Sequence, residues 1–503
     1  MSKHAAIVGS GIGGLTSALL LTERGVKVTI YERMDRIGGR AIFEEEGPYR
    51  IDQGPTIVLL PDMLLDILEE GGFPREQLEL LRCDPLYRLH FRSGRTLTKV
   101  KDNEAQAAEI ERSFPGEGAG FLRFMRELAP LFPQGQKAIL GRSFEAKRDF
   151  FHPATLLLLA KMKAYRSLRG VIGGYFRSEE LKDAYSLQSL YIGGAPFRTP
   201  GIYSLLPYAE HAFGVWMLKG GYGQLPLRMA EELKRRGVTI HTGTEVESLI
   251  VEKGSCKGVV IGGKEHRTDA VLYNGDFPNL EGLLPHHALA ERERRSGGSE
   301  SRDTRASWRR KPRYQPSSGC LLIFAGARKR WPDSLTHQFF LPESLHKSLQ
   351  HVFDRGEIPS DPSYYVFNPV QLDESAAPPG ESVLYFLIPV PTEGIRWEGE
   401  AERLAERVLA DAEKRGFEGL RDSLVWKKLR TPADALREGL YGGGSFGIAP
   451  VLTQSGVFRP QPKPYAIENL YAAGASVHPG GGIPIVMQGA RLAVNQMLKE
   501  MKS

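Results

Sequence analysis

The chain has 503 residues, 41% of them hydrophobic and 25% charged, and its formal net charge is +6. This length predicts two or three domains, and the composition is typical of a soluble globular enzyme. The three cysteines (Cys83, Cys256, Cys320) are widely spaced without a CxxC pair, which favours a reducing cytosol over a disulfide framework or a metal site. No apolar run approaches the roughly 18 residues needed to cross a bilayer. We expect no signal peptide, because the first motif begins within a few residues of Met1.

The N-terminal region predicts a strand, a glycine-rich turn and a helix in succession. The strand covers residues 4–8, the turn residues 9–14 (GSGIGG) and the helix residues 15–24. Glycine permits the tight bend, lets the backbone approach a pyrophosphate, and lets the helix pack closely on the strand. The helix N-terminus would also face the phosphates. A dinucleotide is therefore expected to bind at Gly9, Gly11, Ile12, Gly13 and Gly14.

A second predicted strand, residues 28–31, ends at Glu32. A carboxylate there can accept hydrogen bonds from the adenosine ribose hydroxyls and would repel a 2′-phosphate, so FAD or NAD is favoured over NADP. We include the adjacent Arg33 in the site. Gly38-Gly39-Arg40 then offers backbone amides and a guanidinium to pyrophosphate oxygens, with Gly39 and Arg40 as the predicted contacts. NAD-dependent dehydrogenases do not need this second element, so it favours FAD.

Two further turns are predicted to reach the same cofactor. Asp52-Gln53-Gly54-Pro55-Thr56 would pass near a flavin through Gly54, Pro55 and Thr56, and an ordinary turn before a helix is the alternative interpretation. Residues 244–246 follow a predicted strand, which would place the backbone of Val246 at the adenine edge.

The α/β rhythm is interrupted and later resumes. The patterns predict helices at 62–72, 104–133, 154–190, 225–236, 400–415 and 485–501, and strands at 239–241, 246–251, 258–261, 270–273 and within 319–391. A nucleotide-binding domain interrupted by insertions explains this order. The predicted divisions are FAD-binding parts at 1–75, 223–290 and 441–503, a helical region at 76–222, and a substrate-domain sheet at 291–440.

A glycine-rich run near the C-terminus predicts the flavin end of the site. A buried strand ends at Gly474, and Gly480-Gly481-Gly482 leads into a helix. The N-terminus of that helix can stabilise negative charge on the N1–C2=O edge of a reduced flavin. The predicted contacts are Gly474, Ala475, Gly482, Ile483 and Pro484. His478 is the titratable candidate for a catalytic base in this run, and a purely structural histidine is the alternative.

The segment 291–313 is rich in arginine and also contains Ser296-Gly297-Gly298-Ser299. This composition predicts a solvated surface loop. The alternative is a segment that binds anionic lipid head groups through its basic side chains. Nucleic acid is not expected as a partner, because aromatic residues are sparse in the segment.

Motifs over nearly the whole chain resemble the flavin-containing carotenoid (phytoene) desaturases within the amine oxidase-like flavoproteins. Bacterial 4,4′-diapophytoene desaturases are the most similar in the segments 52–58, 190–193, 202–207, 213–221, 445–447 and 473–486. The resemblance implies FAD as cofactor and a linear C30 carotenoid precursor as substrate, desaturated by hydride transfer to flavin N5. It also implies an α/β fold: a Rossmann-type FAD-binding domain interrupted by a substrate domain with a mixed β-sheet and a helical, membrane-facing part.

A polyene without polar groups requires a long apolar tunnel. We expect its walls at residues 150–151, 156–159, 171–176, 205–206 and 216–217. The implied location is cytoplasmic, peripherally on the cell membrane, through the amphipathic region 150–176 with Lys161, Lys163, Arg166 and Arg169 at its flanks. Assembly into a homo-oligomer is compatible with the sequence.

Other functions remain open on the sequence alone. A diapocarotenoid terminal oxygenase or oxidase and a C40 phytoene desaturase would share most of these motifs. An amine oxidase would need an aromatic cage and a lysine-held water at flavin N5. A non-enzymatic prenyl-lipid chaperone would share the fold but would have no use for a helix at the flavin edge.

Overall fold

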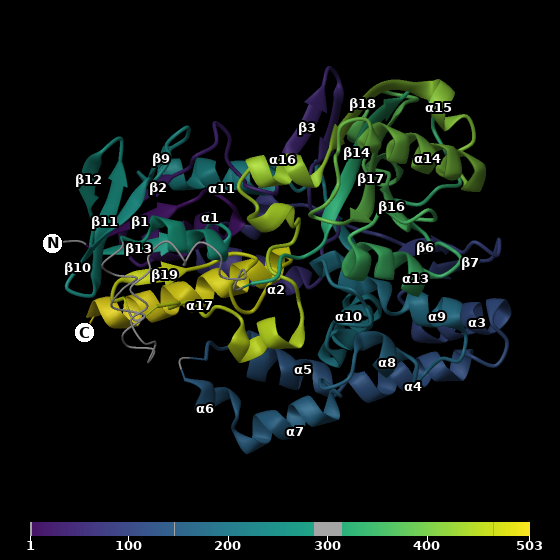
Figure 1. Cartoon of the computed structure of the whole chain (residues 1–503), viewed down its shortest axis with the longest axis horizontal. Coiled ribbons are helices and arrows are strands. Elements are labelled where there is room, and N and C mark those ends of the chain that lie inside the picture. Colours follow the sequence, from purple (N-terminus) through teal and green to yellow (C-terminus); the bar gives the residue numbers. More distant parts are fainter. Residues whose placement is uncertain (1–2, 145, 286–313, 466, 503) are drawn as a thin grey trace.

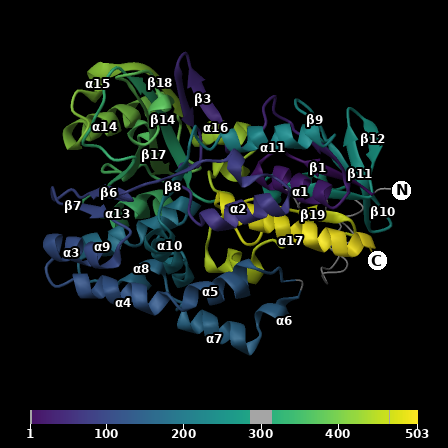
Figure 2. The same ribbon diagram turned by 180° about the vertical axis from the view of Figure 1, so that it is seen from behind.

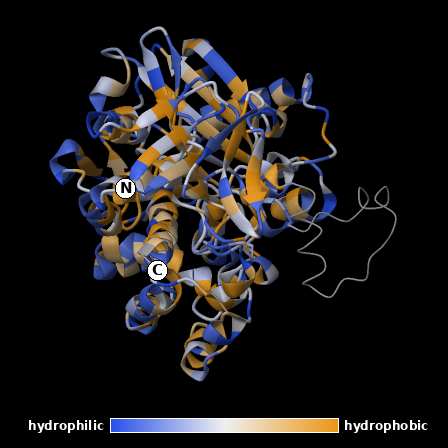
Figure 3. Cartoon of the chain, turned by 90° about the vertical axis from the view of Figure 1, so that its left-hand side faces the viewer, coloured by the Kyte–Doolittle hydropathy of each residue, from blue (hydrophilic) through white to orange (hydrophobic). Residues whose placement is uncertain are grey.

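The computed structural model of the chain describes residues 3–144, 146–285, 314–465 and 467–502. The arginine-rich segment 291–313 lies outside the described residues. In Figure 1 a parallel sheet stands at left, a larger sheet at upper right, and a layer of helices lies beneath them. Figure 3 shows apolar residues concentrated along the central strands, as expected for a buried core.

The parallel sheet has the order β19-β13-β1-β2-β9 and draws its strands from three distant stretches of the chain. These strands are β1 (His4–Val8), β2 (Lys27–Tyr31), β9 (Thr239–His241), β13 (Ala270–Tyr273) and β19 (Leu470–Ala472). Helix α1 (Ile12–Glu23) packs against α11 (Gln224–Arg235) and α17 (Ile483–Lys502), and α17 also packs on α2 (Pro61–Glu70). In Figure 2 this helical layer covers the rear of the sheet. The carboxyl ends of all five strands share one edge, where ligands bind in open α/β sheets.

The first helix begins at Ile12, earlier than the predicted start at Leu15. Two motif glycines, Gly13 and Gly14, therefore belong to its first turn. A Cβ on Gly14 would lie 2.1 Å from the backbone oxygen of Gly9, so the strand, turn and helix can approach this closely only without a side chain there.

The larger sheet has the order β18-β14-β17-β16-β15-β6-β7 and is antiparallel except for the pair β15 and β6. Its strands are β6 (Tyr87–His90), β7 (Thr96–Lys99), β14 (Gly319–Ala327), β15 (His337–Phe340), β16 (Tyr364–Phe367), β17 (Ser382–Val390) and β18 (Leu424–Arg430). Helix α14 (Glu400–Arg415) shares a core with Leu321, Ile323 and Phe386 on one face, and alternate residues such as Leu322 and Tyr385 belong to the core on the other. The sequence patterns did not predict β6 and β7.

The helical layer is more broken than the sequence predicted. Residues 104–133 contain α3 (Asn103–Ser113), α4 (Gly118–Leu128) and α5 (Leu131–Gly135), and residues 154–190 contain α7 (Pro153–Lys161), α8 (Leu168–Ile172) and α9 (Glu179–Ala184). Breaks coincide with Pro115-Gly116, Pro130 and Gly173-Gly174, which stop or bend helices. Helix α10 (Leu205–Phe213) completes the layer. No described helix is both long and apolar enough to cross a membrane.

The smaller sheets are β10 (Ser248–Glu252), β11 (Ser255–Ile261) and β12 (Lys264–Arg267); β3 (Phe43–Glu46) with β4 (Tyr49–Asp52); and β5 (Leu80–Arg82) with β8 (Trp216–Leu218). The architecture confirms a mixed α/β fold with one parallel and one mixed sheet. The domain divisions stay a prediction, although the parallel sheet does assemble from segments inside all three predicted FAD-binding parts.

Candidate flavin and substrate cavity

A continuous cavity of about 1310 Å³ extends from the carboxyl edge of the parallel sheet to the larger sheet and the helical layer. It exceeds the ~300–1,000 Å³ usual for a ligand pocket, so it has room for a cofactor together with a long substrate. All but one of the predicted cofactor residues line it: Gly9, Gly11, Ile12, Gly13, Glu32, Arg33, Gly39, Arg40, Gly54, Pro55, Thr56, Val246, Gly474, Ala475, Gly482, Ile483 and Pro484. The exception is Gly14, which packs behind the turn.

The phosphate end is formed by two glycine turns lying side by side. Gly11 and Gly38 form a parallel bridge, and the Gly38 amide donates to the carbonyl of Ser10 at 3.2 Å. A Cβ on Gly39 would lie 3.2 Å from the Cα of Gly11, which is a tight contact, and the positive φ of +62° at Gly39 also favours glycine. The N-terminus of α1 opens between these turns, as a pyrophosphate site requires.

Arg40 is held in the cavity wall by a carboxylate that the sequence analysis missed. Its Nη2 donates to Asp276 Oδ2 at 2.8 Å, and its Nε is buried without a hydrogen-bond partner. Asp276 also accepts from the Tyr441 amide and from Ser476 Oγ, which ties it to the C-terminal motif. Asp276 could have been found from its place just after β13, at the binding edge of the sheet.

Glu32 shapes the first turn as well as facing the cavity. Its Oε2 accepts from the Ser10 amide at 2.7 Å and from Ser10 Oγ at 2.8 Å, and its Oε1 accepts from the Met34 amide at 2.9 Å. A carboxylate has about four acceptor sites, so capacity remains for a ribose hydroxyl. The predicted contact between Glu32 and ribose is therefore compatible with this geometry and stays a prediction.

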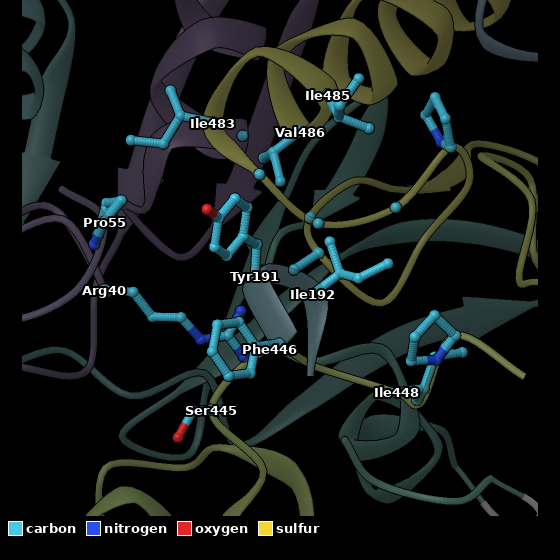
Figure 4. A pocket seen from close by; sticks show the side chains of 18 of the residues that line it. Arg40, Pro55, Tyr191, Ile192, Ser445, Phe446, Ile448, Ile483, Ile485 and Val486 are labelled. Carbon is cyan, nitrogen blue, oxygen red and sulfur yellow. The ribbon is translucent and has the colours of Figure 1, made fainter. Parts of the chain in front are cut away.

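The C-terminal motif closes the cavity opposite the N-terminal turns. The Ala473 amide donates to the Tyr273 carbonyl at 2.9 Å, which continues the parallel sheet up to Gly474. Gly474 and Gly482 adopt φ values of +116° and +95°, which side-chain-bearing residues rarely do. Helix α17 then begins at Ile483 with its N-terminus at the cavity (Figure 4).

His478 lines the cavity but is engaged in holding its wall. Its Nε2 is 3.0 Å from the carbonyl oxygens of Ile139 and Arg142, which requires the proton on Nε2, and its Nδ1 is buried without a partner. Burial lowers the pKa of His478 to about 4, so the ring is neutral at pH 7. This geometry favours the structural interpretation of His478 over that of a catalytic base.

The substrate half of the cavity is walled by rings and leucines. Tyr191, Phe339, Tyr365 and Tyr385 form a row with centroid separations of 5.9, 4.9 and 6.2 Å. Of the expected wall residues, Phe150, Phe151, Leu156, Leu159, Leu205 and Leu206 line the cavity. Leu157 and Leu158 do not line it, and neither do residues 171–176 and 216–217, whose apolar side chains pack into the protein core instead.

The described lining contains no lysine. Lys219, which follows β8, pairs instead with Glu79 at 2.9 Å, and half of its side chain is exposed. The water-holding lysine expected of an amine oxidase is thus not found among the described cavity residues.

The described residues fit FAD. The glycine turns, the N-terminus of α1 and the unpartnered Nε of Arg40 suit a pyrophosphate, and the N-terminus of α17 suits the flavin ring. The family model for flavin-containing amine oxidoreductases matches residues 12–498. The chain belongs to this family. It is a flavoprotein oxidoreductase with FAD as its cofactor. This confirms the predicted enzyme class and the predicted cofactor.

Individual relatives show which members of this family the chain resembles. The chain is 45% identical over 496 residues to a 4,4′-diapolycopen-4-al dehydrogenase of Metabacillus indicus, covering 98% of this chain and 97% of that protein. It is 29% identical to the 4,4′-diaponeurosporene-forming 4,4′-diapophytoene desaturase of Staphylococcus aureus, covering 99% of both. An oxidoreductase structure from Methanosarcina mazei covers 99% of this chain and 100% of its own, with a TM-score of 0.64 at 17% identity, which supports the fold alone. The resemblance to carotenoid desaturases is thereby confirmed.

Proposed function

We propose that this flavoprotein oxidises a linear C30 carotenoid, by desaturating 4,4′-diapophytoene toward diaponeurosporene and diapolycopene. The observation that carries this proposal is the continuity of the cavity, in which an apolar, aromatic-lined half opens directly onto the predicted flavin contacts. Relatives named for desaturation of such polyenes support it.

The residues of the chain have distinct tasks in this reaction. When bound, FAD supplies the two-electron oxidant that accepts a hydride from the substrate. The two glycine turns and Arg40 hold the dinucleotide, and the motif 474–484 positions its flavin end. The row of rings and the leucine walls align the chain of the polyene and exclude water, so that orientation provides much of the rate enhancement.

Oxidation of a terminal aldehyde is the second candidate. The relative with 45% identity is named as a 4,4′-diapolycopen-4-al dehydrogenase, whereas the desaturase described above is 29% identical. The same cavity and cofactor would serve both reactions.

Expression in a host that makes only colourless 4,4′-diapophytoene tests the proposal. We expect coloured products that have each lost two hydrogens per new double bond. Supplying a C30 aldehyde instead tests the second candidate, for which the product gains one oxygen. Carotenoid oxidation would be refuted if the purified protein contained FAD but neither 4,4′-diapophytoene in the host nor the supplied C30 aldehyde was converted.

We further propose that the cavity opens toward a lipid surface. Its rim, which we call the apolar rim, consists of exposed large apolar residues: Phe151, Leu156, Tyr165, Leu452 and Phe458. Phe151 and Phe458 come from distant segments, yet their ring centroids are 6.2 Å apart. Exposed basic residues Arg148, Lys161 and Arg166 lie nearby in the sequence and would attract anionic head groups. Arg169 has no such role, because it pairs with Asp183 and Glu179.

Leu157→Asp tests this docking surface without altering the cavity lining. Leu157 on α7 and Leu436 on α16 (Pro432–Arg437) are each 58% exposed, and in Figure 1 α7 lies at the bottom of the molecule and α16 near the top. We expect Leu157→Asp to reduce sedimentation with anionic vesicles at low salt at least about five-fold, because a charge replaces buried apolar area. Leu436→Asp serves as the matched control and should bind like the wild type. Equal vesicle binding by all three proteins would exclude this surface.

A further inference from the structure

A fully buried ion pair lies behind the wall of the substrate half of the cavity. Lys99 at the end of β7 and Glu210 on α10 are both 0% exposed, with Nζ 3.4 Å from Oε2. Burial lowers the pKa of Lys99 to about 8, and Glu210 opposes that shift, so the ammonium is still charged at pH 7. Its Nζ lies over the ring of Tyr185 at 3.9 Å and over that of Tyr87 at 5.0 Å.

Three neutral side chains complete the hydrogen bonding of Glu210. Tyr87 donates to Oε2 at 2.6 Å and Gln188 at 3.0 Å, and the Tyr191 hydroxyl donates to Oε1 at 3.0 Å. The cluster comprises Lys99, Glu210, Tyr87, Tyr185, Gln188 and Tyr191, and of these residues Tyr191 alone lines the cavity. Figure 4 shows its side chain and hydroxyl projecting among the cavity residues. Tyr191 therefore connects the buried charges to the ligand space.

The direction of these hydrogen bonds determines what Tyr191 can recognise. Because its one proton is donated to Glu210, the Tyr191 oxygen can take part in any further hydrogen bond only as an acceptor. An acceptor recognises a donor, and a hydrocarbon chain has none. A buried ion pair is seldom more stable than apolar residues of the same size, so a tunnel for hydrocarbon alone would gain nothing from this cluster.

We propose that Tyr191 and Glu210 form a receiving site for an O–H group at the end of an oxidised carotenoid, either a primary alcohol or a hydrated aldehyde. The inference rests on the proposed function, and it selects terminal oxidation as an activity of the same cavity. Tyr191 is then a catalytic residue, and Glu210 acts through it with Lys99 as its counter-ion.

The proton inventory of the step balances. Water adds to the aldehyde to give R–CH(OH)₂. The O–H proton passes to the Tyr191 oxygen while the Tyr191 proton passes to Glu210 Oε1. The carbon-bound hydrogen leaves as a hydride, for which bound FAD would supply the two-electron acceptor, the C=O bond forms, and the product is R–COOH. A primary alcohol follows the same course and yields the aldehyde.

Ligand binding and turnover by the purified FAD-loaded enzyme test the proposal together. The probes are C30 polyenes that differ only at one end, which carries a methyl, a primary alcohol or an aldehyde group, and affinity is read from fluorescence quenching. We expect the wild type to bind the alcohol-ended polyene about five-fold more tightly than the methyl-ended one. Tyr191→Phe should abolish this preference, keep the affinity for the methyl-ended polyene, and slow oxidation of the alcohol and aldehyde about 100-fold or more.

Tyr175→Phe is the matched control. Tyr175 donates to Glu127 at 2.7 Å in the same helical layer, but it does not line the cavity, so its loss should leave both affinity and rate unchanged. Equal binding of alcohol- and methyl-ended polyenes by the wild type would overturn the inference even if Tyr191→Phe failed to fold. A folded Tyr191→Phe that keeps the preference would also overturn it. If FAD binds but no polyene is oxidised at all, the proposed function fails instead.

Discussion

The two halves of the cavity are built in different ways. The flavin half is made largely of backbone, from glycine turns at fixed spacings that meet at the edge of one parallel sheet. The substrate half is made of side chains from the larger sheet and the helical layer, with a row of four rings as its most regular feature. A short motif can specify the first arrangement, whereas only the packed tertiary structure specifies the second.

This contrast predicts different tolerance to substitution. Where backbone meets backbone, an added methyl group has no space and no flexible neighbour to displace. Where side chains meet, exchange at constant volume usually costs little. In the flavin half, the addition of a single methyl group should therefore reduce stability or FAD binding. In the substrate half, only substitutions that change the shape of the cavity or remove one of its few polar groups should have a large effect.

Gly14→Ala should give the largest effect. The added Cβ would lie 2.1 Å from the Gly9 carbonyl oxygen, so the turn and α1 must separate. We expect at least about 3 kcal/mol of destabilisation and loss of FAD during purification. Gly282→Ala is the control, because Gly282 itself lines the cavity, which Gly14 does not, and its Cβ would meet nothing within 4 Å. Urea unfolding and the flavin absorption spectrum give both readings, and FAD retention by Gly14→Ala would contradict the backbone argument.

His478→Ala should come next, at about 2–3 kcal/mol, because it leaves the Ile139 and Arg142 carbonyls without their donor and opens a small void. His478→Gln is the discriminating variant, since its amide can donate as Nε2 does but cannot act as a base. With FAD bound, we expect Gln to restore stability and most of the turnover. A stable, FAD-loaded His478→Gln with turnover reduced about 100-fold would instead assign His478 as the base.

The flavin half was largely predictable from sequence, and the reason is local. β9 and β13 have the predicted bounds, and seventeen of the eighteen predicted cofactor residues line the cavity. Each glycine in these motifs meets a local requirement of the turn, so its spacing in the sequence is enough to predict its place at the cofactor.

The substrate half was not predictable in the same way. Glu210 owes its role to Lys99, which lies on another element 111 residues away in the sequence. β6 and β7 join the sheet beside β15, far along the chain, and with four residues each they are too short for their alternation to predict a strand. Such contacts arise from tertiary packing, which overrides local preference.

Arg40→Ala should weaken FAD binding about 10- to 100-fold. It also removes the cation that pairs with the buried Asp276 carboxylate, so some loss of stability is expected as well. The guanidinium carries a free Nε–H at the cavity wall, and a charged hydrogen bond to a phosphate is worth about 1.5–3 kcal/mol. Arg24→Ala removes the same charge from an exposed ion pair with Glu70 and should change the FAD dissociation constant less than about two-fold. Fluorescence titration of the apoprotein with FAD measures both. Equal affinities would place the pyrophosphate away from Arg40.

The smallest effect concerns acid stability, in which the two halves should be alike. Burial lowers the pKa of His337, which is hydrogen-bonded to Tyr365 in the substrate half, to about 3, and that of His478 in the flavin half to about 4. Both are neutral when folded and near pKa 6.5 when unfolded, so the unfolded chain gains protons as pH falls below 6.5 and stability is lost.

Between pH 7.5 and 5.5 each ring should therefore cost about 1.4 kcal/mol of unfolding free energy. His337→Asn and His478→Gln should each reduce the acid sensitivity by this amount. Burial raises the pKa of Asp52 to about 7, so Asp52 increases the unfolding free energy of the protein as pH falls. This contribution is the same in the wild type and both variants and cancels in the comparison. Urea unfolding at the two pH values measures the difference. If only one variant changed the pH dependence, the pKa values of the two histidines in the folded protein would differ. Burial, which the two share, would then not determine those pKa values.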